Sequence, residues 1–162
     1  MSQSSTPLNI SSTPQKSGGS CCHWATTSAG CAERMGITLV RLMVGVVFVV
    51  HGSQKWFVWH PAGTVAGFAH LGFPPAAAYT AMTAELLCGV LLVLGLFTRL
   101  AAIPIVITMA VAILKVHFAN GFFVTNLGYE YALTLGIAAL ALVLAGPGML
   151  AVDNLFAGRR KS

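Results

Sequence analysis

Charged side chains are scarce in this chain, and acidic ones are the scarcest. Of its 162 residues, 8% are charged, with four acidic against nine basic, whereas a soluble domain carries about 25% charged residues. Long polar stretches are also missing apart from the N-terminal tail, so no segment can bury a soluble core of its own. Apolar residues make up 56% of the chain, and the mean hydropathy is +0.80. This balance excludes a soluble globular domain and indicates a small polytopic membrane protein.

The sequence also lacks the patterns of a disulfide-rich, metal-binding, secreted or nucleic-acid-binding protein. Cys88 lies inside an apolar run, and the other cysteines lie in a tail expected to be cytoplasmic, where thiols stay reduced: Cys21, Cys22 and Cys31. Their spacing with His23 matches no standard zinc pattern, so we predict no metal site. The first apolar run begins too late and is too long for a signal peptide. The basic residues behind the net charge of +5 lie at the edges of apolar runs and at the C-terminus, so we expect no nucleic-acid partner.

Four apolar stretches predict an all-α, four-helix transmembrane bundle. We place the spans at about residues 35–57, 74–99, 100–118 and 127–145, because about 20 apolar residues cross a bilayer. Residues 58–73 are too short to cross and predict an outer-surface loop with a short interfacial helix flanked by tryptophans. We therefore expect a disordered cytoplasmic tail over residues 1–33, a membrane domain over 34–157 and a basic tail over 158–162.

Basic residues predict the orientation of the bundle. Four spans place both termini on one side. If that side is the cytoplasm, the inner flanks carry Lys16, Arg34, Arg41, Arg99, Arg159, Arg160 and Lys161, and the outer flanks carry Lys55 and Lys115. Because positive residues concentrate on the cytoplasmic side, we predict a plasma (inner) membrane protein with both termini inside.

The second span contains a carboxylate, Glu85, at its centre. Residues 74–99 carry no other charge until Arg99, and Glu85 lies about 15 Å from the start of the span, close to the bilayer midplane. A carboxylate there must be protonated, paired or in contact with water. Arg41 is our expected partner for Glu85, because a long arginine side chain spans much of the difference in depth.

The first span carries its polar and small residues on one face. At 100° per residue, one wedge contains Arg41, Gly45, Phe48, Gly52 and Lys55, with His51 beside it. Lipid does not tolerate such a face, so we expect it to point into the bundle.

A second polar cluster is expected near the outer edge. It consists of His51, Lys55, Lys115, His117, Tyr129, Glu130 and Tyr131. We expect Glu130 to pair with Lys115 or Lys55. Glu85 and Arg41 are the candidate catalytic residues, and the candidate ligand-binding residues are His51, Lys55, Tyr79, Lys115, His117, Glu130 and Tyr131. A structural ion pair and interfacial hydrogen bonding stay open as the alternative for these two groups.

Together these motifs resemble the DoxX family of membrane proteins. The resemblance covers about residues 35–156 and rests on Arg41-x3-Gly45-x2-Phe48-x2-His51-Gly52-x2-Lys55, Gly72-Phe73-Pro74, Glu85-x2-Cys88-Gly89, Gly95-Leu96-x-Thr98-Arg99, Gly121-Phe122-Phe123, Gly128-Tyr129-Glu130-Tyr131 and Gly146-Pro147-Gly148. It implies a four-helix membrane protein. The family is named for a subunit of a thiosulfate:quinone oxidoreductase, other members are linked to membrane redox and oxidative-stress complexes, and no settled catalytic residues carry over.

Three functions follow as hypotheses. The first is a membrane subunit of a quinone-linked redox complex, with a quinone in the bundle, Glu85 and Arg41 at its oxygen, and a partner subunit that carries the cofactor, since the chain has no motif for flavin, haem or an iron–sulfur cluster. The second is a non-catalytic anchoring or assembly protein, and either could be a homo-oligomer. The third is a small-solute transporter, which we rank lowest because the spans show no inverted repeat and no helix broken at the midplane.

Overall fold

A computed structural model describes residues 23–154 of the chain, with side chains from residue 30 onward. Within this range the chain is helical, and no strand is present. The elements in order are α1 (His23–Ser53), the π-helical turn η1 (Gln54–Val58), α2 (His60–His70), α3 (Pro75–Leu94), α4 (Thr98–Ala112), the π-helical turn η2 (Ile113–His117), the 3-10 turns η3 (Phe118–Asn120) and η4 (Val124–Asn126), and α5 (Glu130–Ala145).

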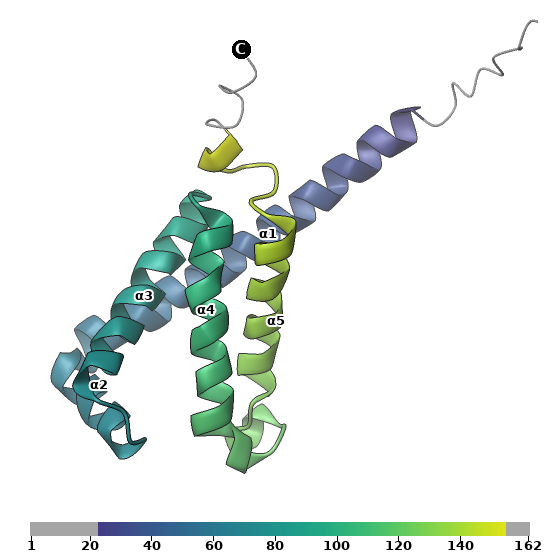
Figure 1. Cartoon of the computed structure of the whole chain (residues 1–162). Helices are drawn as coiled ribbons and strands as arrows, with labels where there is room; N and C mark the ends of the chain where they lie inside the picture. The colour runs from purple at the N-terminus through teal and green to yellow at the C-terminus, as the bar shows by residue number, and fades with distance from the viewer. Residues whose placement is uncertain (1–22, 155–162) are drawn as a thin grey trace, which may run out of the picture.

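The helices form a bundle in which α1 packs on α3, α3 on α4, and α4 on α5, while α5 also touches α1. Helix α1 runs obliquely across the others, and its first half projects beyond them (Figure 1). Helix α2 packs on α3 at the opposite end of the bundle. The core lies where the four long helices meet and includes Phe48, Leu92, Ile105 and Leu142.

Three helical stretches are long and apolar enough to cross a membrane: Gly30–Val58, Pro75–Leu94 and Thr98–Asn120. They correspond to the first three predicted spans. Helix α5 is apolar but has 16 residues, about 24 Å at 1.5 Å per residue. The predicted surface helix between the first two spans is present as α2.

The predicted boundary of the N-terminal tail is wrong where the structure describes it. Helix α1 begins at His23, so residues 23–33 are helical rather than disordered. The sequence prediction began the helix after Arg34 because the residues just before it are small and polar and do not extend the apolar face. The rest of the predicted tail, residues 1–22, and the predicted basic tail over 158–162 lie outside the described residues.

The segment after α5, residues 147–154, crosses one end of the bundle, and we call it the strap. Gly146 and Gly148 have φ values of +89° and +76°, which favour glycine, and they turn the chain from α5 into the strap. Its hydrogen bonds reach α1, the α3–α4 turn and α4: Met149 N–H to Thr38 Oγ1 (2.9 Å), Asp153 N–H to Gly95 O (3.0 Å), Phe97 N–H to Asp153 Oδ1 (2.8 Å) and Thr98 N–H to Asp153 Oδ2 (3.0 Å). This end is the strap end, and the opposite one is the α2 end (Figure 1).

Candidate functional site

A partly buried ion pair between Lys55 and Glu85 joins η1, the turn that follows α1, to the middle of α3. Lys55 Nζ donates a hydrogen bond to Glu85 Oε2. The lysine side chain is 17% exposed and the glutamate side chain 4%. Among the residues that the structure describes, this is the one salt bridge. Because an unpaired charge is costly within a membrane, each side chain of this pair compensates the charge of the other.

The expected pairing of Arg41 with Glu85 is therefore wrong. Arg41 lies about 21 Å along α1 from Lys55, at 1.5 Å per residue. Its Nη2 donates instead to Leu150 O in the strap. Helical spacing correctly placed both basic residues on the inward face, but it did not tell which of the two Glu85 would meet.

Local backbone structure brings Lys55 to Glu85. Lys55 lies in η1, where the helix widens and Trp59 N–H bonds to Gln54 O at 2.9 Å. Thr64, buried in α2, donates from Oγ1 to Lys55 O at 3.2 Å. Single π-helical turns are rare and recur at functional sites. The turn and the α2 contact together hold the lysine backbone in place.

Glycines let α1 and α3 approach closely beside the ion pair. A Cβ added to Gly52 would lie 2.6 Å from Leu86 N, and one added to Gly89 would lie 2.6 Å from Val49 N. Gly45 is similarly close to Val93 N, at 2.9 Å. The inward face predicted from the sequence is confirmed, since Arg41, Gly45, Phe48 and Gly52 are buried and Lys55 is partly buried.

Arg41 forms a separate polar site at the strap end. The residue is 1% exposed, and its Nε and Nη1 have no hydrogen-bond partner among the described residues. A Cβ added to Gly95 would coincide with its guanidinium, so only glycine fits beside it. Arg41 therefore contacts the strap and the α3–α4 turn, and it lies away from Glu85.

The expected outer cluster gathers at the α2 end only in part. The rings of His51 and Tyr131 have centroids 6.3 Å apart. His117 Nδ1 bonds to Leu127 O at 2.6 Å, and Tyr129 packs edge-on against Phe122 with 5.5 Å between ring centroids.

The remaining members of the predicted site point elsewhere. Glu130 Oε2 accepts a hydrogen bond from Val124 N–H at 3.0 Å, so the expected pairing of Glu130 with Lys115 or Lys55 is wrong. Lys115 is exposed, and Tyr79 is 47% exposed on α3. These side chains do not converge on the Lys55–Glu85 pair.

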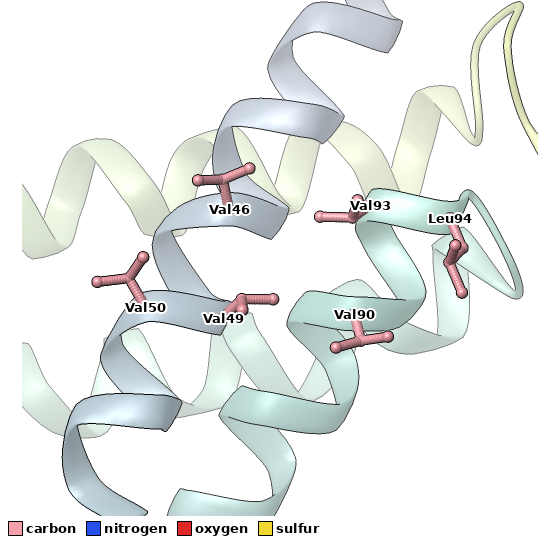
Figure 2. A pocket seen from close by; sticks show the side chains of 6 residues that line it. All are labelled: Val46, Val49, Val50, Val90, Val93 and Leu94. Carbon is pink, nitrogen blue, oxygen red and sulfur yellow. The ribbon is translucent and has the colours of Figure 1, made fainter. Parts of the chain in front are cut away.

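A groove and a hollow lie at the surface of the described part of the chain, and neither is lined by Lys55 or Glu85. A groove of about 310 Å³ between α1 and α3 is lined by aliphatic side chains alone: Val46, Val49, Val50, Val90, Val93 and Leu94 (Figure 2). A hollow of about 300 Å³ lies at the strap end between the start of α4 and the strap. No group of three His, Cys, Asp or Glu side chains within the described range could hold a metal ion.

Sequence reasoning missed the roles of Thr64 and Asp153. Both contact backbone groups that lie distant in the sequence or in another helix. The one available signal was that Asp153 is the single aspartate of the chain and follows a Gly-Pro-Gly turn.

Comparison with known proteins places the chain in a family. The DoxX family model matches residues 36–118. "Putative oxidoreductase CatD" of Bacillus subtilis is 33% identical over 127 residues, which cover 78% of this chain and 91% of that protein. "Inner membrane protein YphA" of Escherichia coli is 29% identical over 132 residues, covering 77% and 93%. "Uncharacterized membrane protein Rv3486" of Mycobacterium tuberculosis is 29% identical over 135 residues, covering 76% and 82%.

No solved structure gives a significant match. The matched region contains α2, α3 and α4, the part of α1 from residue 36 onward, and both members of the ion pair. Together with the apolar helices, these matches show that the chain is a membrane protein and belongs to the DoxX family.

Proposed function

We propose that the chain is an integral membrane subunit of a redox complex, in which the Lys55–Glu85 pair binds the polar head of a quinone. The observation that carries this proposal is the ion pair itself, which is largely buried and lies within two of the apolar stretches. Ionisable residues inside a membrane are costly and mark functional sites by default. One relative has a name that describes an oxidoreductase, and this supports a redox role for the present chain.

The two side chains fit the needs of a quinone head. A quinone supplies two-electron chemistry coupled to the uptake of two protons. Lys55 Nζ has three N–H donors, of which one bonds to Glu85, so donors remain for a ligand oxygen. Glu85 would hold or pass on a proton. The electrons would come from a partner subunit, since the chain carries no cofactor motif of its own.

The topology that we propose has four spans, with α5 as the fourth. Helix α5 lies side by side with α4 (Figure 1). The bond between Met149 N–H and Thr38 Oγ1 ties the segment after α5 to the first half of α1. An even number of membrane crossings places the two ends of the bundle domain on the same side, as this bond requires. The excess of basic residues at that end favours the cytoplasmic side of the plasma membrane.

A second candidate is a non-catalytic assembly or anchoring subunit. Lys55 and Glu85 satisfy each other, and the groove beside them in the seam between α1 and α3 offers no polar side chain. An ion pair of this kind also fixes which helices pack together. Under this function the pair holds α1 on α3, and the redox chemistry belongs entirely to a partner.

Quinone content distinguishes the two functions. The protein is purified in mild detergent from quinone-containing membranes, the bound lipids are extracted, and quinones are quantified by mass spectrometry. We expect about one quinone per chain in the unmodified protein and a loss of most of it in Glu85→Gln. The control is Glu33→Gln, since Glu33 is exposed on the projecting part of α1. Each variant is included only if it elutes as a single folded species.

Equal quinone content in Glu85→Gln would remove the ion pair from the binding site. Absence of quinone from every sample would favour the assembly role. Lys55→Arg is the second variant, because it keeps the charge of the pair, and we expect it to retain more quinone than Lys55→Gln.

A further inference from the structure

The hollow at the strap end has the features of a phospholipid site. It lies between the first residues of α4 and the strap, has a volume of about 300 Å³ and combines aromatic, aliphatic and polar lining residues. We propose that it binds the headgroup of an anionic phospholipid, with Arg99 as the ligand of the phosphate. This site is distinct from the Lys55–Glu85 pair and does not depend on the redox proposal.

Arg99 offers a positive charge that the described part of the chain does not use. The residue is exposed and forms no side-chain hydrogen bond or ion pair with any described residue. Its guanidinium lies over Gly146 at the end of α5, where an added Cβ would be 3.1 Å from Nε. A guanidinium presents N–H donors in a plane that matches the oxygens of a phosphate.

The carboxylate in the hollow does not oppose an anion. Both oxygens of Asp153 accept backbone N–H groups at the start of α4, from Phe97 at 2.8 Å and from Thr98 at 3.0 Å. The positive end of the helix dipole also lies there and compensates the charge of the carboxylate. Arg99 is therefore the dominant charge that the hollow presents to a ligand.

A buried threonine lies behind the surface of the hollow. Thr98 is 0% exposed, lines the hollow, and its Oγ1 has no hydrogen-bond partner among the described residues. The hydroxyl is closed off from the solvent side of the hollow, so Arg99 is the side chain whose donors a phosphate there would contact.

The depth of the hollow favours a lipid over a free anion. Thr98 is the first residue of the apolar stretch Thr98–Asn120, so the hollow lies at the end of a span, at the level of the headgroups. Phe97 and Leu100 beside it are 62% and 69% exposed, and they would contact the glycerol and upper acyl chains. A basic side chain beside exposed apolar side chains matches a phospholipid, which has a charged headgroup attached to acyl chains.

Native mass spectrometry of the full chain tests this site. The detergent-solubilised protein is titrated with phosphatidylglycerol and, in parallel, with phosphatidylcholine. We expect tighter binding of phosphatidylglycerol, weakened about tenfold by Arg99→Gln, since that change removes the charge-assisted hydrogen bonds to the phosphate. Arg99→Lys should recover part of that loss. The matched control is Lys115→Gln, an exposed cation near the opposite end of the same span, which should leave binding unchanged.

Three results would overturn the proposal. These are equal affinity for the two lipids, unchanged affinity in Arg99→Gln, and displacement of phosphatidylglycerol by an equal concentration of inorganic phosphate. The last result would assign the hollow to a free anion. Thermal unfolding of Arg99→Gln without lipid separates a binding defect from a folding defect, and we expect it to match the unmodified protein.

Discussion

Glycine residues determine how closely α1 can approach α3, and therefore whether Lys55 reaches Glu85. Gly52 and Gly89 each face backbone atoms of the opposite helix at distances that no real Cβ would tolerate. Small residues at such crossings allow backbone contact, which is a main source of helix association in lipid. The glycines and the ion pair thus belong to the same packing arrangement.

We predict that Gly52→Ala and Gly89→Ala each lower the free energy of unfolding by about 1–3 kcal/mol, because the added methyl overpacks the crossing. The matched control is Gly36→Ala in the projecting part of α1, where an added Cβ meets nothing within 4 Å. That change should leave stability the same or raise it by about 0.5–1 kcal/mol through helix propensity. Unfolding in mixed detergent micelles measures all three, and an equal effect at the three positions would contradict close packing at the crossing.

At the scale of single residues, the sequence predicted which face of a helix a side chain lies on better than which residue it pairs with. The spacing of Arg41, Gly45, Phe48, Gly52 and Lys55 placed them on one face, and the structure confirms that face. Periodicity gives no information on how two helices cross, and depth alone favoured Arg41 over Lys55 as the partner of Glu85. The pairing of Lys55 with Glu85 depends on the π-helical turn and on the contact from Thr64, and no local sequence pattern predicts either of these.

Helix α4 is capped by a residue far away in the sequence. Asp153 accepts the N–H groups of both Phe97 and Thr98, as the side chain of an N-cap residue would do. Its own N–H bonds to Gly95 O at 3.0 Å. The strap is thus part of the start of α4, although it follows α5 in the chain.

Removing this cap should destabilise the strap end. We expect Asp153→Ala to lower the free energy of unfolding by about 0.5–2 kcal/mol, the usual cost of losing a helix N-cap. Asp153→Asn should cost less, since the amide oxygen still accepts one of the two bonds. Hydrogen exchange of the Phe97 and Thr98 amides is the sharper measurement. Unchanged exchange in Asp153→Ala would show that the carboxylate does not bind these amides.

At the element scale, the sequence predicted the existence of the helices more reliably than their ends. The apolar runs identified α3 and α4 and the short α2, because length and hydropathy are local properties. The start of α1 at His23 was missed, since its first turns carry no apolar face that a periodic pattern would detect. The cap from Asp153 was missed because tertiary structure, and not the residues before α4, supplies it.

For the molecule as a whole, the number of crossings decides the side on which the strap lies. Four crossings place the strap and the first half of α1 on the same side of the membrane, and the bond between Thr38 and Met149 agrees with that arrangement. Three crossings would place them on opposite sides, and this contact could not form in a membrane.

Reporter fusions test this topology in the intact chain. We expect a fluorescent protein fused to the C-terminus to be bright in bacterial cells, and an alkaline phosphatase fused there to be inactive, because both report a cytoplasmic end. The control is alkaline phosphatase inserted at Gly72, in the turn after α2, which should be active outside. An active phosphatase at the C-terminus would contradict four spans with cytoplasmic termini.

A double-mutant cycle on the ion pair tests the central geometry most directly, because it measures which basic residue is coupled to Glu85. Unfolding free energies are measured for Lys55→Met, Glu85→Gln and the double variant, and for a parallel cycle in which Arg41→Met replaces the lysine change. We predict a coupling energy of about 1–3 kcal/mol between Lys55 and Glu85, and a value near zero between Arg41 and Glu85. Strong coupling to Arg41 without coupling to Lys55 would contradict the pairing on which the proposed site rests.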